Sequence, residues 1–285
     1  MTPSFNLVGR LFNAPVALRE ASRDVAVGLL AEWASATRSG AMKALAEELR
    51  EAREWTPYDV VAGVAIIPIR GVLIQRVAEL GWWAEYLGIA GYDDIRLKFL
   101  QALADPDVKA IVFSIDSPGG DVAGCFDLVD TIFAARGTKP IAAILEESAY
   151  SAAYAVASAV DPGRLYVPRT GGVGSVGVIY MHVSIEKALE KNGFEVTLVT
   201  KGSRKAEGNE FSALSEQALK AIKADVDEIG ALFDRTVARN RGLDAAKVSG
   251  TEAGTFMGAA GVEVGFADKV MAPDAAFRAL LAELG

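Results

Sequence analysis

The feature that most constrains the fold is a regular alternation of apolar, β-branched runs with amphipathic segments of helical period. Strands are expected at residues 60–75, 108–116, 139–145, 164–168, 173–184 and 194–200. Helices are expected at residues 93–107, 121–136, 149–160, 185–193 and 212–241. Strands that alternate with helices along a chain typically lie in a largely parallel sheet. The sequence therefore predicts an α/β fold.

The two ends of the chain differ from this alternating region. Residues 1–56 form a separate N-terminal segment, in which residues 24–55 are rich in alanine and leucine with charges at helical spacing, which indicates one or two amphipathic helices. Residues 273–285 read as one short amphipathic helix. We therefore expect a helical N-terminal extension (1–56), a main domain (57–272) and a C-terminal helix (273–285).

Composition excludes several classes of protein. Apolar residues make up 51% of the chain and charged residues 23%, as in globular proteins. The net charge of −8 argues against a nucleic-acid binder, which normally carries a basic face. The single cysteine, Cys125, excludes an internal disulfide and a zinc signature. No apolar run reaches the ~18 residues of a membrane span, and no signal-peptide core precedes the first charges. We expect a soluble protein without metal or cofactor.

One candidate for chemistry is the segment EESAYSAAYAVASA (146–159), which carries Ser148 and Ser151. Ser151 follows a predicted strand and begins a predicted helix, where developing negative charge is stabilised. Its small neighbours leave room for a substrate backbone. The alternative is a small-residue helix packed tightly on the sheet, with Ser148 as a helix cap.

A second candidate is IDSPGGDVAG (115–124), predicted at the end of a strand and the start of a helix. Adjacent glycines let the backbone turn and bring bare N–H groups close to a ligand. Such donors suit an oxyanion that forms when a carbonyl is attacked. The alternative is an ordinary strand-to-helix turn.

A base for a serine nucleophile is less obvious, because the chain has one histidine, His182, which lies in a predicted strand. The loop TKGSRKAEGNEF (200–211) supplies Lys201, Arg204 and Lys205. An exposed lysine is a poor base at neutral pH, but burial disfavours its charged form and lets it accept a serine proton. Taken alone, these lysines fit solvated loop charges better than a catalytic base.

The order of four motifs, SPGG, YSAAY, VPRTGGVGSVGVI and GSRKAEGN, resembles the signal peptide peptidase A family of serine proteases. The resemblance covers about residues 60 to 270. It implies the ClpP/crotonase fold, a repeated β-β-α spiral, for the main domain. HVSIEKALEKNGFEVTLVTKGSRKAEGNEF is most similar to the phage-type branch that processes capsid scaffolds.

The resemblance also assigns roles to individual residues. Ser151 matches the family nucleophile, and Lys205, 54 residues later, matches the general base. Gly119, or its neighbour Gly120, and Ala152 would supply the amides of the oxyanion hole. This chain departs from the family where Ala152 and Ala153 replace two glycines and where KGSRK replaces the commoner S-G-A-H-K, which puts the fine geometry in question.

The function implied is a serine endopeptidase that cleaves scaffold or head proteins during capsid maturation, in the host cytoplasm, within or on the assembling prohead. A ring-like homo-oligomer is expected, with helix 212–241 and the aromatic segment around Trp82, Trp83 and Tyr86 as candidate contacts. From the net charge and the lack of a long apolar run, we expect no nucleic-acid partner and no membrane span. The alternatives are a signal-peptide-degrading peptidase, a crotonase-like acyl-CoA enzyme, an inactive assembly component, and a Ser–His mechanism through His182.

Overall fold

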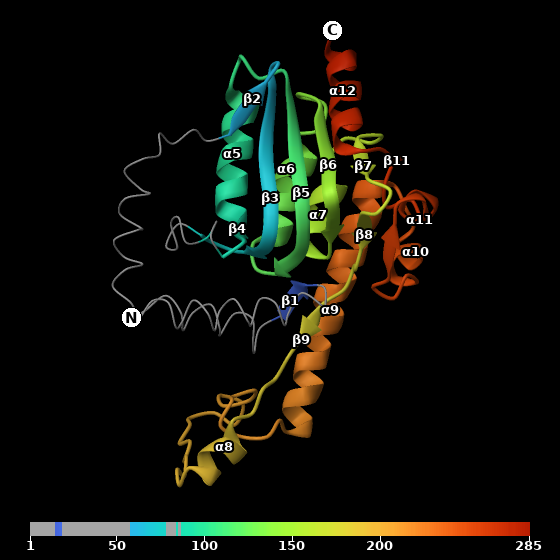
Figure 1. Cartoon of the computed structure of the whole chain (residues 1–285). Helices are drawn as coiled ribbons and strands as arrows, with labels where there is room; N and C mark the ends of the chain where they lie inside the picture. Colours follow the sequence, from blue (N-terminus) through green and yellow to red (C-terminus); the bar gives the residue numbers. More distant parts are fainter. Residues whose placement is uncertain (1–14, 19–57, 78–83, 85–86) are drawn as a thin grey trace, which may run out of the picture.

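A computed structural model describes residues 15–18, 58–77, 84 and 87–285 (Figure 1). The strands are β1 (Pro15–Leu18), β2 (Asp59–Val61), β3 (Val64–Ile74), β4 (Ile89–Gly91), β5 (Ala110–Asp121), β6 (Ile141–Tyr150), β7 (Leu165–Val167), β8 (Gly172–Gly174), β9 (Ile179–Tyr180), β10 (Thr255–Met257) and β11 (Lys269–Val270). The helices are α5 (Tyr92–Ala104), α6 (Cys125–Ala134), α7 (Ala152–Ser158), α8 (Glu186–Lys191), α9 (Glu216–Arg241), α10 (Ala245–Ser249), α11 (Ala259–Glu263) and α12 (Pro273–Leu284).

The centre of the molecule is a parallel sheet of β3, β5 and β6, to which β4, β7 and β8 add further parallel pairs. β2 and β3 form a hairpin where one strand or a strand pair was expected. The sheet continues through β1 to β9, and both of these pairings are antiparallel. The predicted α/β class with a largely parallel sheet is confirmed.

Alternate residues of the central strands face two separate apolar cores. Ile111, Phe113 and Ile115 of β5 pack in the core with α5, α6 and α7, whereas Ala110 and Val112 face the other core. The second core is closed by α12, whose Ala276 and Leu280 are buried. Because both faces of the sheet are covered, the strands are continuous apolar runs and lack a polar face.

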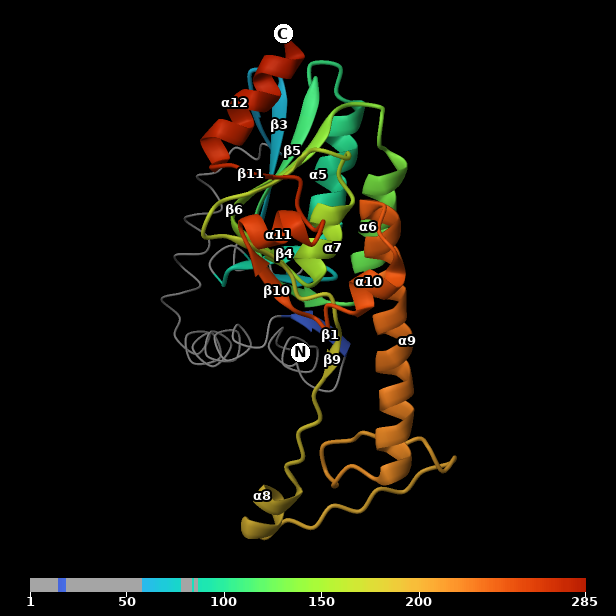
Figure 2. The same ribbon diagram turned by 90° about the vertical axis from the view of Figure 1, so that its right-hand side faces the viewer.

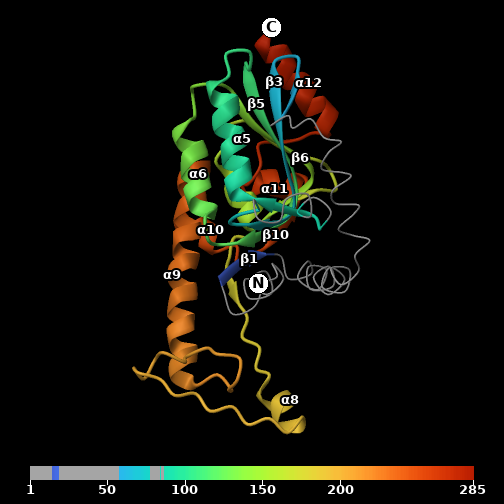
Figure 3. The same ribbon diagram turned by 90° about the vertical axis from the view of Figure 1, so that its left-hand side faces the viewer.

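An arm extends from one end of the sheet, as the two views at right angles show (Figures 2 and 3). It comprises the chain from β9 through α8 to the first turns of α9. The last turns of α9 return to the body, where Phe233, Val237 and Ala238 are buried. In the described part of the chain, no helix combines the length and the apolar stretch needed to cross a bilayer.

Three expectations about secondary structure are wrong. The SPGG segment lies inside β5, and α6 begins at Cys125, so the glycines are not at a helix start. β6 runs on to Tyr150, which the sequence pattern assigns to a helix. Residues 194–200 form no strand, because they have no ladder partner among the described residues. The predicted helices of residues 24–55, together with Trp82, Trp83 and Tyr86, lie outside the described residues, and the described part of the N-terminal extension is the strand Pro15–Leu18.

Helix α7 is held at its C-terminal end by the side chain of Arg136. The guanidinium donates from Nε to the Ala159 carbonyl and from Nη2 to the carbonyls of Ser158 and Asn240, each at 2.9 Å. Terminal helix carbonyls have no partner within the helix, so a cation at this end satisfies them directly. Arg136 thereby ties α7 to the end of α9.

We expect Arg136→Met to destabilise the protein by about 3 kcal/mol, because three carbonyl acceptors lose a charged donor. Urea unfolding followed by circular dichroism measures this. Arg239→Met is the matched control, since Arg239 also stacks on the Phe133 ring, at 4.3 Å against 4.4 Å for Arg136. Arg239 instead pairs with Asp130 at the surface, so its loss should cost about 1 kcal/mol or less. Equal losses in the two variants would show that α7 is not anchored through Arg136.

Candidate active site

Ser151 occupies a strained turn between β6 and α7. Its backbone has φ 53° and ψ −123°, a conformation that non-glycine residues rarely adopt. Its amide donates to the Gly174 carbonyl at 2.8 Å, and its carbonyl accepts from the Ala155 amide at 2.9 Å. Both backbone groups are therefore fixed, and the side chain is directed by a turn of the kind that presents nucleophiles at strand-to-helix junctions.

The Ser151 hydroxyl has no hydrogen-bond partner among the described residues. The Ala152 amide, at the first position of α7, likewise has no acceptor within that part of the chain. A free N–H at a helix N-terminus suits a developing negative charge. Ser151 and Ala152 thus offer a free hydroxyl and a free donor on adjacent residues.

Gly119 follows the last residue pair between β5 and β6. Ser117 of β5 is opposite Ala149 of β6, and Gly119 and Ser151 each come two residues after that pair. Gly119 has φ 101°, which favours glycine, and a side chain on Gly120 would lie 1.8 Å from the Leu73 carbonyl oxygen. The bare backbone of the SPGG segment is therefore required by its packing against β3.

Ser117 is a residue whose role the sequence did not indicate. Its buried hydroxyl donates to the Gly71 carbonyl at 2.6 Å and accepts from the Gly119 amide at 3.2 Å. The long second bond leaves the Gly119 donor weakly engaged. The first letter of SPGG was the available signal, since a serine two residues before a glycine can bond its amide.

Lys205 does not lie at this site in the single chain. It is exposed, in the irregular segment between α8 and α9, which all three views place at the far end of the arm (Figures 1, 2 and 3). His182 also belongs to the arm, where its Nε2 lies 2.9 Å from the Asn209 carbonyl oxygen. The structure places Ser151, with Ala152 next to it, and Gly119 each shortly after the last β5–β6 pair, and it leaves both candidate bases apart from them.

Ser148 has a different environment from Ser151. Its hydroxyl accepts from the Gly172 amide at 3.3 Å, and its own amide donates to Asp116 at 3.3 Å. Ser148 is a regular residue of β6 that helps to join this strand to β8. It therefore fits a structural role better than a nucleophilic one.

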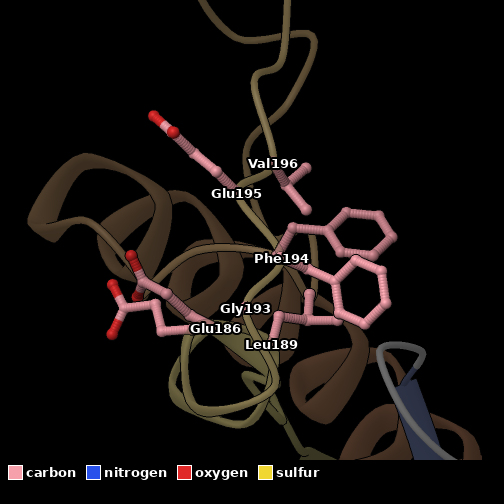
Figure 4. Close-up of a pocket in the computed structure, with 8 residues that line it drawn as sticks. Glu186, Leu189, Gly193, Phe194, Glu195 and Val196 are labelled. Atoms are coloured by element: carbon pink, nitrogen blue, oxygen red, sulfur yellow. The ribbon is translucent and has the colours of Figure 1, made fainter.

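The arm carries a surface hollow of about 450 Å³ at α8 (Figure 4). In the close-up, the ring of Phe194 and the side chain of Val196 point to one side, and the carboxylates of Glu186 and Glu195 point to the other. Its lining residues are Glu186, Leu189, Glu190, Gly193, Phe194, Glu195, Val196 and Phe211. None of the candidate catalytic residues lines this hollow, so it is not the catalytic cleft.

In a comparison with known protein families, residues 134–284 match the family described as "Peptidase family S49". The matched range includes Ser151 and Lys205 and begins after the SPGG segment. The family resemblance read from the motifs is thereby confirmed. The α/β architecture with its parallel sheet agrees with the ClpP/crotonase-like fold that the resemblance implies.

Two phage proteins are similar to most of the chain. The "Head-tail preconnector protein GP5" of Enterobacteria phage P21 is 39% identical over 75% of this chain and 42% of its own length. The "Capsid assembly protease C" of Escherichia phage lambda is 35% identical over 77% of this chain and 49% of its own length. The chloroplastic "Serine protease SPPA" of Arabidopsis thaliana is 29% identical over 42% of this chain and 17% of its own length. The chain therefore spans less than half the length of the two phage relatives.

Cys125 lies against the start of helix α7, with its Sγ 3.8 Å from the Ala152 carbonyl oxygen. Burial raises the pKa of its thiol to about 12. The folded chain therefore favours the neutral thiol. This contribution to stability is complete below the ordinary thiol pKa and is lost as pH rises from there through about 12.

We expect Cys125 in the folded protein to resist thiol reagents, because about a thousandfold less thiolate is present than in the unfolded chain at neutral pH. The measurement is the rate of reaction with a chromogenic disulfide at pH 8, with and without denaturing urea. Rapid reaction of the folded protein would mean that the packing beneath α7 opens to solvent.

Proposed function

Because the chain belongs to peptidase family S49, we propose that it is a serine endopeptidase with Ser151 as nucleophile and Lys205 of a neighbouring copy as general base. The observation that carries the proposal is the strained, backbone-fixed Ser151 with its free hydroxyl, next to the free Ala152 amide and two residues beyond the β5–β6 pairing that Gly119 also follows. This arrangement suits attack on a peptide carbonyl followed by stabilisation of the resulting oxyanion.

The proposed reaction has two stages. The Lys205 amine takes the proton from Ser151 Oγ as the oxygen bonds to the scissile carbonyl carbon, and the amides of Ala152 and Gly119 stabilise the oxyanion. The lysine then returns the proton to the leaving amine, and the C–N bond breaks. A water molecule, deprotonated by the same lysine, releases the acyl group and regenerates the Ser151 hydroxyl.

A base from a second copy follows from the position of the arm. Within one chain, Ser151 Oγ has no partner among the described residues, and Lys205 is exposed at the end of the arm. A lysine that docks against an apolar surface loses hydration, which disfavours its charged form and suits it as a base. The site is incomplete in one copy, and oligomerisation would complete it.

The arm has the surface expected of such a contact. Residues 195–200 make no backbone hydrogen bond with any other described residue, so their N–H and C=O groups are available to a partner strand. The exposed large apolar side chains of residues 194–200 are Phe194, Val196, Leu198 and Val199, and Val199 is 93% exposed. The adjoining hollow at α8 is apolar on one side and can receive a side chain of the neighbouring copy.

The proposed substrates are scaffold or other head proteins of a phage, cleaved in the host cytoplasm within or on the assembling head. Support comes from the similarity to a relative whose name is "Capsid assembly protease C". The acidic chain, with its net charge of −8, also fits a protein partner better than a nucleic acid.

Co-expression of two inactive variants tests the shared site. Ser151→Ala and Lys205→Ala should each abolish cleavage of casein, whereas oligomers containing both should regain up to about one quarter of wild-type activity, since one contact in four then joins an intact serine to an intact lysine. Ser148→Ala and Lys201→Ala are matched controls and should keep most activity.

If Lys205 acted within its own chain, the mixed oligomers would stay inactive, because no subunit would hold both residues. A fluorophosphonate, which phosphonylates the oxygen of serine nucleophiles with loss of fluoride, provides a readout independent of the substrate. Labelling of wild type but not of Ser151→Ala identifies the nucleophile. Absence of labelling in both would contradict the assignment of Ser151.

The rate of cleavage should rise from pH 7 to pH 9, by up to about tenfold per unit, because a lysine base acts only after losing its proton. His182→Gln should show the same profile, since His182 bonds the Asn209 carbonyl within the arm. A profile that levels off above an ionisation near ~6.5, and disappears in His182→Gln, would instead assign the base to histidine.

A further inference from the structure

The strand β1 joins two parts of the molecule that are far apart in sequence. Pro15–Leu18 pairs antiparallel with Gly119–Asp121 at the end of β5, and antiparallel on its other side with Ile179–Tyr180 of β9. Figure 1 shows β1 at the end of the sheet from which the arm departs. Without β1, the edges of β5 and β9 that pair with it would have no partner within the described sheet.

This strand position adjoins the candidate active site. Leu18 stands opposite Gly119 on the edge of β5 that β6 leaves after Ala149, because the other edge of Gly119 and Gly120 is paired with β3. The strand β1 therefore takes the place of β6 along the end of β5, and Ser151 follows two residues after the last paired residue of β6. An extended peptide in the position of β1 would run its backbone past the Gly119 amide.

The site is also closed to solvent while β1 is in place. Ser151 is 1% exposed and Ala152 is completely buried, and both glycines of the SPGG segment are buried. A nucleophile that attacks a second polypeptide has to be reached by it. Some part of the chain must therefore move before a substrate binds, and β1 is the described segment that runs along Gly119–Asp121 on the edge facing away from β3.

We propose that Pro15–Leu18 is a built-in occupant of the peptide cleft, which holds the place of a substrate strand until it is displaced. The inference rests on the proposed function, since it names the cleft of that site. Antiparallel pairing on both sides is the mode by which sheet edges bind extended peptides through main-chain hydrogen bonds. The cleft therefore takes peptides in the direction of β1, with the residue at the position of Leu18 beside the oxyanion donor.

An occupant of this kind weakens substrate binding without altering the chemical step. The apparent dissociation constant of a peptide equals its intrinsic value divided by the fraction of molecules in which the cleft is free. If β1 is docked in about nine molecules of ten, its release tightens peptide binding about tenfold.

The test is the binding of a fluorescein-labelled peptide with the sequence of residues 13–20, NAPVALRE, followed by anisotropy. The full-length Ser151→Ala chain serves as the parent, so that no cleavage intervenes. Val16→Pro with Ala17→Pro in that background removes one ladder donor toward each neighbouring strand, because successive residues of a strand bond to opposite sides. This variant should bind the peptide at least about tenfold more tightly than the parent.

The matched control is Val16→Ile with Ala17→Ser, which keeps both N–H donors and should bind like the parent. Equal affinity in the parent and the proline variant, or no binding by either, would overturn the proposal. Circular dichroism and the urea midpoint establish that the proline variant is folded.

A reversible lock provides a second measurement that does not depend on the proline variant. Val16 and Ile179 are opposite each other in the β1–β9 ladder, within the Cα separation that a disulfide spans. Val16→Cys with Ile179→Cys should cross-link within one chain on oxidation and lose peptide binding, and reduction should restore it. The buried thiol of Cys125 should not compete. Absence of a cross-link, a cross-link between two chains, or binding that survives oxidation would each contradict the proposal.

These measurements use a chain without its nucleophile, so they separate the two proposals. If the proline variant and its parent bind the peptide equally, and the phosphonate labels Ser151 of the wild type, only the inference about β1 is refuted. If the proline variant binds the peptide more tightly, and the phosphonate does not label the wild type, only the protease chemistry is refuted.

Discussion

The complete burial of helix α7 is the constraint on which the rest of the site depends. All seven of its residues are buried, and the small side chains of Ala152, Ala153, Ala155 and Ala157 let it pack closely on the sheet. The strained backbone of Ser151 costs on the order of 1–3 kcal/mol. The strain is sustained because α7 is fixed at both ends, by the Gly174 carbonyl at its start and by Arg136 at its finish.

Polar contacts inside the apolar core add direction to this packing. The buried hydroxyl of Tyr154 donates to the Phe266 carbonyl at 3.0 Å, and its ring packs 5.0 Å from the Phe266 ring. Burial raises the pKa of Tyr154, so it remains a neutral donor. Such a contact specifies one orientation of α7, whereas apolar packing alone tolerates small shifts. The proposed nucleophile, Ser151, is therefore held at the start of a rigidly packed helix, whereas its proposed base, Lys205, belongs to the extended arm.

Two independent features would keep a single copy of the proposed enzyme inactive. A single copy lacks a base beside Ser151, so activity would await the contact between copies. The strand position beside Gly119 is already filled by Pro15–Leu18, so a substrate would also have to displace an internal strand. Both features use the same physical element, an exposed strand edge whose backbone groups require a partner. A protease that acts on assembling proteins gains from such control, because premature cleavage would destroy its substrates.

The comparison of sequence and structure shows what local patterns can predict. Apolar alternation correctly predicted the class and most helices, because the requirement to bury one face is local to each element. It failed at SPGG, whose glycines indicated a turn, and at residues 149–150, where the high helix propensity of an alanine-rich segment is overridden by the pairing of β6 with β5 and β8. It also failed at residues 194–200, where an apolar, β-branched run lacks the partner that would make it a strand.

By itself, the sequence determined the α/β class, the family, and the serine and glycines that would carry the chemistry. These follow from residue types and their order, which need no knowledge of distant contacts. Only the tertiary structure decided that Ser151 is strained, that Lys205 lies apart on an arm, and that β1 fills the strand position beside Gly119. Register and strand neighbours are set by contacts between segments far apart in the sequence, such as those of Val16 with Asp121 and of Pro15 with Tyr180. No local pattern encodes such contacts.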